Sequence, residues 1–91
     1  MEFEWDSDKA TINFQNHGVR FSESTDVFYD DLAITITDNE SDPTEQRFVA
    51  LGMGNKGFLL VVVYTHRGEN IRIISARYAE RHERKEYEEQ L

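Results

Sequence analysis

The sequence predicts an α+β domain with two N-terminal helices, a four-stranded antiparallel meander and a C-terminal helix. Four short apolar or alternating stretches follow one another with short turns between them, and short connections favour antiparallel neighbours. Helix signals lie before and after these stretches, so helices and strands are segregated along the chain. A chain of 91 residues is long enough for one domain with a modest core, which we expect to span residues 1–91.

The first predicted helix covers residues 7–17. Asp6 or Ser7 offers a side-chain oxygen for its N-cap, and Gly18 offers a left-handed stop. Ahead of this helix, Glu2–Trp5 alternates polar and apolar residues, a pattern typical of a short edge strand.

A second, shorter helix is predicted over residues 23–29. Ser22 offers its N-cap oxygen, and a pair of aspartates directly after residue 29 ends it. Val27 and Phe28 are its apolar residues, and we expect both to face the core.

Four strands are predicted after the two helices. The first reads LAITIT, an alternation rich in β-branched residues. The third is almost continuously apolar, which indicates a central strand that is covered on both faces. In chain order, the predicted strands are residues 32–37, 47–53, 58–66 and 71–77.

The connections and the last helix follow from local composition. Residues 38–44 read DNESDPT, contain the only proline and predict a mobile loop. Residues 54–57 and 67–70 predict tight turns between strands. Residues 79–90 are nearly all good helix formers and predict the C-terminal helix.

The formal charge of −8 is unevenly distributed along the chain. Residues 1–46 hold twelve acids and two bases, a net charge of −10. Residues 47–78 hold five bases and one acid, a net of +4, and residues 79–91 hold five acids and three bases, a net of −2. The overall acidity argues against broad non-specific binding to nucleic acid, but residues 47–78 leave room for a local basic surface.

Composition also bounds the cellular setting. The chain has no cysteine, which fits a reducing compartment and excludes thiolate chemistry. The N-terminus lacks the basic flank and apolar stretch of a signal peptide, and the longest apolar run, residues 58–64, is too short to span a bilayer. We therefore expect a cytoplasmic protein without membrane contacts.

Two arginines of the last predicted strand are the first candidates for chemistry, because grouped arginines suit phosphate or carboxylate recognition. In a regular strand Arg72 and Arg77 face opposite sides, since they lie five positions apart. A bend near residues 75–76 would bring them onto one face. The alternative is that both arginines only pair with acids of the N-terminal half.

The remaining polar and aromatic candidates give weaker signals. The histidines lack metal-ligand spacing, so the sequence predicts no metal site and no cofactor. His17 lies at a helix end, where a cation complements the helix dipole. Trp5, the only tryptophan, is suited either to stacking on a base or to covering the core, and the core role is the commoner one in a small domain.

Four motifs carry a resemblance to a known family. They are W-D-x-x-K from Trp5, N-F-x-x-H-G from Asn13, R-I-I-S-A-R from Arg72 and R-x-E-R-x-x-Y from Arg81. In this order, and over essentially the whole chain, the sequence resembles the BrnT toxins of bacterial type II toxin–antitoxin modules.

The resemblance implies an α+β fold like that of the RelE ribonuclease toxins. It also implies that the protein cleaves RNA and blocks translation, and that a ribbon-helix-helix antitoxin of BrnA type neutralises it. Contact with DNA would be indirect, through the antitoxin. The implied catalytic residues are Lys9, Arg67 and Arg77. We expect RNA contacts from Trp5, His17, His66, Arg72 and Tyr78.

The implied chemistry can be compared with these residue types. Attack of the 2′-hydroxyl on RNA needs a proton acceptor, cations that stabilise the pentavalent phosphate and an acid for the 5′-oxygen. Arginine serves the second role, whereas neither arginine nor an unperturbed lysine is a good base near neutral pH. His17 or His66 is a candidate acid or base if it lies near the arginines. We expect metal-independent cleavage in which positioning contributes most.

The acidity of the chain departs from the family pattern, because ribonuclease toxins of this fold are usually basic. An active form then relies on a focused cationic patch. Two other functions stay open. One is a non-catalytic module that binds a DNA-binding antitoxin through acidic surface and tunes operon transcription. The other is an α+β domain whose arginines only balance charge.

Overall fold

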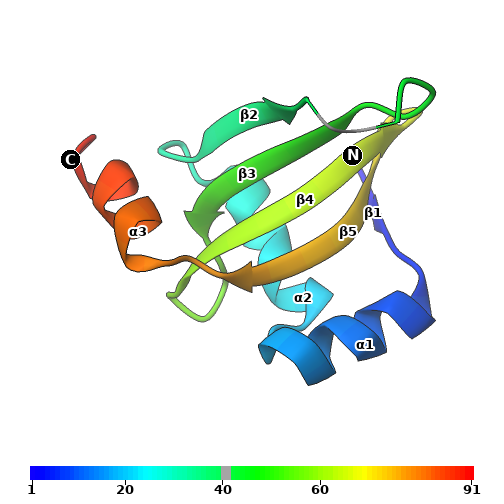
Figure 1. Cartoon of the computed structure of the whole chain (residues 1–91), viewed down its shortest axis with the longest axis horizontal. Helices are drawn as coiled ribbons and strands as arrows, with labels where there is room; N and C mark the ends of the chain where they lie inside the picture. The colour runs from blue at the N-terminus through cyan, green and yellow to red at the C-terminus, as the bar shows by residue number, and fades with distance from the viewer. Residues whose placement is uncertain (40–41) are drawn as a thin grey trace.

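The computed structural model describes residues 1–39 and 42–91 and has a twisted sheet with helices on both sides (Figure 1). The elements in chain order are β1 (Phe3–Glu4), α1 (Ser7–His17), α2 (Phe21–Ser24), the 3₁₀ helix η1 (Thr25–Tyr29), β2 (Ile34–Asp38), β3 (Arg47–Met53), β4 (Leu59–Arg67), β5 (Asn70–Tyr78) and α3 (Arg81–Glu88). The α+β class is confirmed, and β3 begins and ends where the sequence predicts.

The sheet has five strands in the order β1-β5-β4-β3-β2, so β4 is central as predicted. The three strand pairs of the meander β2–β5 are antiparallel, whereas β1 runs parallel to β5, with Phe3 opposite Ile71. The predicted four-stranded, fully antiparallel RelE-like sheet is therefore wrong in strand number and in this pairing. A two-residue edge strand gives no sequence signal for a partner that lies nearly 70 positions away.

Helix α1 begins and ends as predicted because both of its caps are local. The Asp6 carboxylate accepts hydrogen bonds from the backbone N–H groups of Asp8 and Lys9 at 2.9 and 3.0 Å. These bonds to the backbone, that from Lys9 being the strongest cause, lower the pKa of Asp6. At the other end Gly18 adopts a left-handed conformation with φ of 71°.

The second predicted helix is correct in place but wrong in its start. Helix α2 begins at Phe21 rather than after a Ser22 cap, and the chain tightens into η1 at Thr25. Phe21 is 2% exposed and Val27 is fully buried, so two apolar anchors six positions apart fix this segment against the sheet. Phe28 packs against the same core, as expected for both inward residues.

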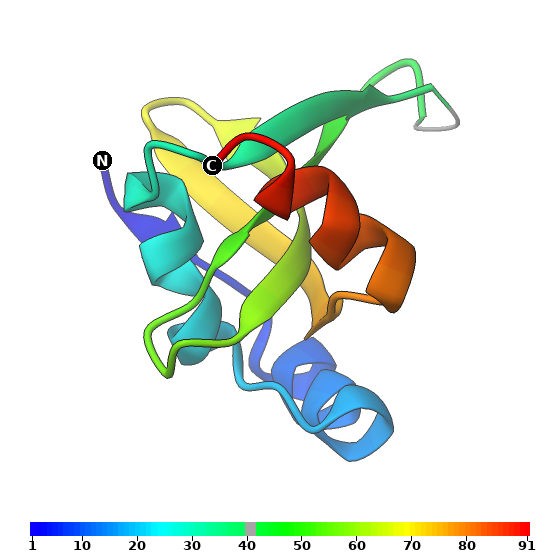
Figure 2. The same cartoon turned by 90° about the vertical axis from the view of Figure 1, so that its left-hand side faces the viewer.

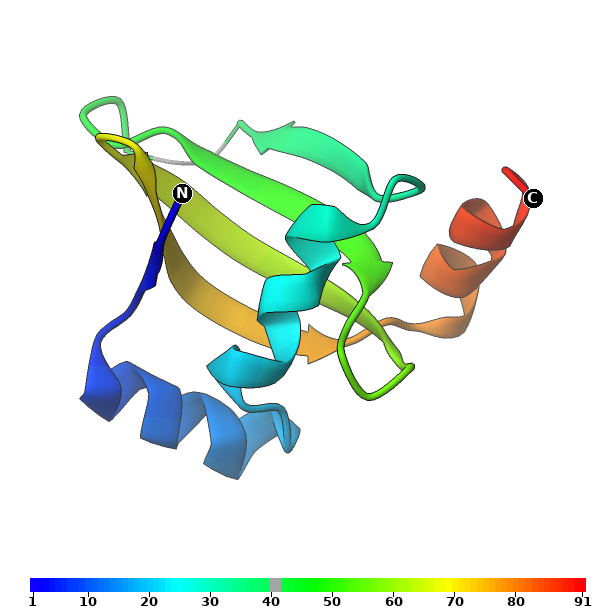
Figure 3. The same cartoon turned by 180° about the vertical axis from the view of Figure 1, so that it is seen from behind.

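The two faces of the sheet are covered to different extents. Helices α1, α2 and η1 lie over one face, which holds the larger core, while α3 lies on the opposite side at one end (Figures 2 and 3). We call the side of α3 the open face, because only one end of it is covered. The smaller core under α3 consists of Leu51, Leu59, Val61 and Tyr87.

The remaining bounds differ from prediction by a few residues. Strand β2 starts at Ile34 rather than at residue 32, and α3 is shorter than the predicted 79–90. The loop predicted to be mobile includes residues 40 and 41, which lie outside the described residues. Within the described part of the chain, each helix is too short or too polar to cross a membrane.

Candidate functional site

A β-bulge places the two arginines of β5 on the same face. Tyr64 pairs with Ile73 but Val63 pairs with Ser75, so Ile74 is an extra residue on β5. Beyond the bulge the alternation of side chains is reversed. As a result Arg72, opposite Thr65, and Arg77, opposite Val61, both project from the open face. The bend that the sequence left open is therefore present, one residue before the predicted position.

The buried side chain of Asn13 holds this part of β5. Its amide group donates to the carbonyl of Ala76 at 2.8 Å, and its carbonyl accepts from the Ala76 N–H at 3.1 Å. A third bond, to the carbonyl of Val19 at 3.0 Å, fixes the end of α1. At Ala76, strand β1 no longer runs beside β5. The Asn13 carboxamide therefore makes the backbone hydrogen bonds that a neighbouring strand would otherwise make there.

At the end of the open face covered by α3, Arg77 is held by a short two-bond ion pair. Its two terminal nitrogens donate to the two carboxylate oxygens of Glu83 at 2.8 and 2.9 Å. Glu83 also accepts from the backbone N–H of Glu80 and so caps α3. These bonds, that from Arg77 above all, lower the pKa of Glu83 to about 2. The guanidinium is therefore part of the joint between β5 and α3.

The far end of α3 is held by a second polar contact. The Tyr87 hydroxyl donates to Asp30 at 2.6 Å, and the same carboxylate oxygen accepts from the Met53 N–H at 2.9 Å. The bond to Asp30 raises the pKa of Tyr87 to about 12. Burial alone would raise the pKa of Asp30, but its hydrogen bonds from Tyr87 and two backbone groups outweigh burial and lower it.

The arginines make only weak ion pairs at the opposite end of the open face, beside the turn that joins β4 to β5. We call this end the turn end. Arg72 lies 3.3 Å from Glu4 and Arg67 lies 3.5 Å from Glu45, each through a single nitrogen–oxygen contact. The Arg67 side chain is half exposed. The alternative that the strand arginines pair with N-terminal acids therefore holds for Arg72, whereas Arg77 pairs with the C-terminal helix.

The three residues implied to be catalytic are not gathered at one point. Arg67 and the partner position of Arg77 on β4, Val61, are six residues apart, or roughly 20 Å along a strand. Lys9 lies on α1, where it lines a cavity of about 240 Å³ with His17, beside the bulge of β5. The cavity and the two ends of the open face are thus three separate places, and the catalytic roles stay predictions.

His66 and Tyr78, two of the predicted RNA contacts, lie away from the open face. His66 alternates with Arg67 on β4, and its ring lies 5.3 Å from that of Phe48 on the covered side. Tyr78 packs its ring edge-to-face on Phe58 at 5.7 Å, at the end of β5. Their predicted roles remain untested, but neither side chain lies beside the open-face arginines.

Known protein families and solved structures include relatives of this chain. A family model described as the ribonuclease toxin BrnT of type II toxin–antitoxin systems matches residues 5–83. The chain belongs to the BrnT family of type II toxins. The crystal structure of the Brucella abortus ribonuclease toxin BrnT is similar, with a TM-score of 0.72, 25% identity, and coverage of 89% of this chain and 99% of that one. A comparison with curated protein sequences gave no match.

The segment matched by the BrnT family model contains both ends of the open face. It starts at Trp5 and ends at Glu83, the residue that pairs with Arg77, and leaves out the rest of α3. Membership of a type II family implies an antitoxin partner for this toxin.

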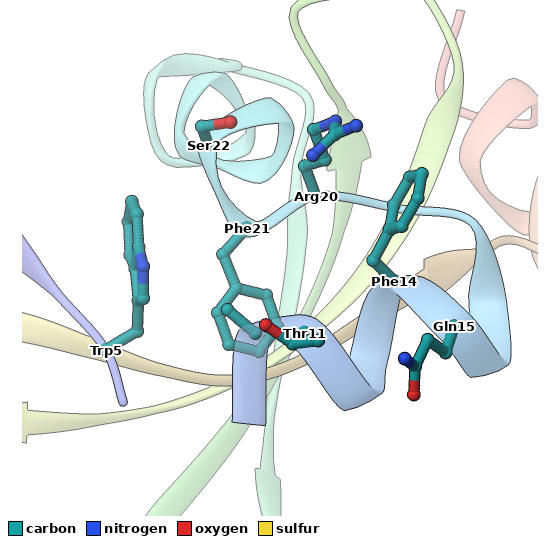
Figure 4. A pocket seen from close by; sticks show the side chains of 8 residues that line it. Trp5, Thr11, Phe14, Gln15, Arg20, Phe21 and Ser22 are labelled. Carbon is teal, nitrogen blue, oxygen red and sulfur yellow. The ribbon is translucent and has the colours of Figure 1, made fainter. Parts of the chain in front are cut away.

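Trp5 lies on the other side of this BrnT-family toxin, in a groove of about 520 Å³ between α1 and α2. Figure 4 shows Trp5 at one side of the groove and Phe14 with Arg20 at the other. The indole packs edge-to-face on Phe21 at 6.0 Å yet is 36% exposed, so it covers the core and keeps a free surface. The Arg20 guanidinium stacks on the Phe14 ring at 4.2 Å.

One group of side chains in the described residues has donor atoms close enough to share a metal ion. Glu80, His82 and Glu83 each place one ligand atom within 4.8 Å of the others. Both oxygens of Glu83 already accept hydrogen bonds, from Arg77 and from the Glu80 N–H. The group is therefore explained by the start of α3, and we assign no metal to it.

Sequence reasoning missed the roles of Asn13 and Glu83. Asn13 belongs to the motif that carried the family resemblance, but its partner Ala76 is 63 positions away, so no local pattern shows the contact. Glu83 had a signal, because it lies three residues after the N-cap Glu80 and completes a capping box. Its second role, as the partner of Arg77, depends on the path of the chain between β5 and α3.

Proposed function

We propose that this BrnT-family toxin is an endoribonuclease that cleaves RNA, inhibits translation by doing so, and is neutralised by a ribbon-helix-helix antitoxin of BrnA type. The family match over residues 5–83 carries the proposal. The open face supports it, because Arg67 and Arg72 project from it on neighbouring strands and the bulge adds Arg77 to the same side of an otherwise acidic protein.

The separation of the arginines shapes the mechanism. Since Arg67 and Arg77 lie roughly 20 Å apart, they would contact different phosphates of one RNA strand that runs along β4. Each guanidinium would neutralise phosphate charge and fix the strand, so positioning would supply most of the rate. Cleavage would proceed without a metal, by attack of the 2′-hydroxyl on the neighbouring phosphate.

Lys9 and His17 would act from the edge of the sheet. Both line the small cavity beside Ser75, whose partner Val63 lies on the open face. Of the two, the imidazole is the better proton carrier near neutral pH, while the ammonium of Lys9 would supply positive charge. In this arrangement an RNA strand on the open face would bend around the bulge to reach them.

Growth and RNA integrity test this proposal. Induction of the toxin without an antitoxin should arrest growth and fragment cellular RNA, and purified toxin should cleave RNA in the presence of EDTA. Arg67→Ala should relieve the arrest while leaving the fold intact, because the side chain is half exposed and weakly paired. Arg20→Ala, which removes a cation from the other side of the sheet, is the matched control. Normal growth with soluble, folded wild-type toxin would sink the proposal.

A second candidate function is a non-catalytic module that binds the antitoxin and tunes operon transcription, with DNA contacted only through the antitoxin. The net charge of −10 over residues 1–46 favours it, since such a surface attracts a basic antitoxin segment. It predicts tight antitoxin binding, strong salt dependence of that binding and intact RNA after induction.

A further inference from the structure

Arg47 is an open-face arginine with a buried nitrogen, Nε, that has no hydrogen-bond acceptor among residues 1–39 and 42–91. The carboxylate of Asp42 lies close enough to interact with the charge of Arg47, but it does not accept a hydrogen bond from Nε. Arg67, Arg72 and Arg77 each have an acid within 3.5 Å. A buried N–H donor without an acceptor costs free energy, and an anion bound against Nε would relieve that cost.

The register of the sheet places Arg47 beside other cations. Arg47 lies opposite Thr65, and Thr65 lies opposite Arg72, so the three side chains form one row across β3, β4 and β5. Two strand spacings separate the arginines, which puts their backbones roughly 10 Å apart. Thr65 is 2% exposed, and its hydroxyl donates to the Gln46 carbonyl at 2.7 Å. It is therefore a short, buried residue between the two longer arginine side chains. Two extended arginine side chains can reach one phosphate across such a gap.

Acids lie only at the two edges of the same row. Asp38 of β2 lies opposite Arg47, and Glu4 of β1 lies opposite Arg72. The interior of the row is therefore cationic and its rims are anionic, which disfavours an RNA strand lying across the sheet. A strand along β4 avoids both rims and passes from the row toward Arg77.

We propose that Arg47 and Arg72 form a phosphate-binding subsite above Thr65, which takes one phosphodiester of the RNA strand. The subsite rests on the proposed ribonuclease function and adds Arg47 to its RNA contacts. Among the described residues, Nε of Arg47 has no hydrogen bond to give up, and the guanidinium of Arg72 gives up one contact of 3.3 Å with Glu4. A carboxylate of a protein partner has similar chemistry, so antitoxin binding is measured beside RNA binding.

Binding of a non-cleavable RNA tests the subsite. Fluorescence anisotropy of a single-stranded oligonucleotide with 2′-O-methyl riboses gives Kd for wild type, Arg47→Gln and Arg20→Gln over a range of salt concentrations. We expect Arg47→Gln to raise Kd roughly fivefold to tenfold and to reduce the slope of log K against log salt by about 0.7, the release expected for one phosphate contact on a single strand. Arg20→Gln makes the same change of charge on the other side of the sheet, and should change Kd less than about twofold.

A lysine variant distinguishes a direct contact between the Arg47 guanidinium and phosphate from a general effect of net charge. Arg47→Lys should keep the salt slope but recover only part of the affinity, because an ammonium cannot bind phosphate with two parallel bonds. Equal Kd values for Arg47→Gln and Arg20→Gln would overturn the subsite. So would loss of antitoxin binding by Arg47→Gln with RNA binding unchanged, which would assign the row to the protein partner. If wild type neither binds nor cleaves RNA, the proposed function fails first.

Discussion

The two ends of the open face hold arginine in different ways. At the α3 end, Arg77 makes two short bonds to Glu83, whose carboxylate also caps the helix. At the turn end, Arg67 and Arg72 each make one contact of 3.3–3.5 Å, and Nε of Arg47 has no hydrogen-bond acceptor within the described residues. Arginines that look alike in the sequence therefore differ in what they are free to bind.

The difference separates a structural joint from a ligand surface. A short bidentate pair with one partner 18% exposed is worth more than a long, exposed contact, because water screens the latter and side-chain entropy opposes it. An anion at the α3 end must displace Glu83, whereas an anion at the turn end displaces weak contacts or none. We infer that the turn end makes the first contact with RNA and that Arg77 is reached only in competition with Glu83.

The largest effect is expected from Asn13→Ala, which would remove the anchor that keeps both ends on one face. The variant leaves buried backbone groups of Ala76 and Val19 without partners, so the free energy of unfolding should fall by about 3 kcal/mol. Urea denaturation measures it. Asn16→Ala, on the exposed side of the same helix, is the control and should change stability by less than about 0.5 kcal/mol. Equal losses in the two variants would contradict the anchoring role.

A smaller effect should distinguish the two kinds of ion pair. A double-mutant cycle on Arg77 and Glu83 should give a coupling energy of about 2 kcal/mol, and the same cycle on Arg67 and Glu45 less than about 0.5 kcal/mol. Alanine variants and urea denaturation supply both cycles. Similar coupling at the two ends would remove the contrast on which the account depends.

Acid should weaken the α3 end selectively. The pKa of Glu83 falls from 4.5 to about 2 on folding, so its contribution to stability is complete above pH 4.5 and is lost as the pH falls toward 2. Between pH 4.5 and about pH 3 we expect a loss of about 1 kcal/mol from this group, after allowing for screening at the 38% exposed Arg77. Glu83→Gln should show a smaller loss over that range. An unchanged pH dependence in the variant would show that other carboxylates control acid unfolding.

The elements with local signals could be predicted from the sequence. Asp6 and Gly18 set the ends of α1 through bonds to neighbours within four residues, and the turn at residues 54–57 set the end of β3. The unbroken apolar run identified β4 as the central strand. These features depend on residues close together in the chain, where spacing alone carries the information.

The features that shape the candidate site depend on contacts between distant residues. The parallel pairing of β1, the bulge at Ile74 and the anchor from Asn13 each join segments that are far apart in sequence. The bulge decides which face of the sheet Arg77 occupies. Regular alternation of side chains along β5 would place Arg77 on the face opposite to Arg72. Family resemblance supplied Lys9, Arg67 and Arg77, but the structure separates them along and around the sheet.

The most direct test of the account is an NMR titration of nitrogen-labelled protein with the non-cleavable single-stranded RNA. We expect the largest shifts at the backbone amides of Arg47, Thr65 and Arg72, with smaller ones toward Arg77. Trp5 is the only tryptophan, so its single indole N–H signal reports on the groove between α1 and α2 and should shift less than the amides of the row. Shifts confined to the Trp5 indole and its neighbours, with the turn end unaffected, would contradict the account.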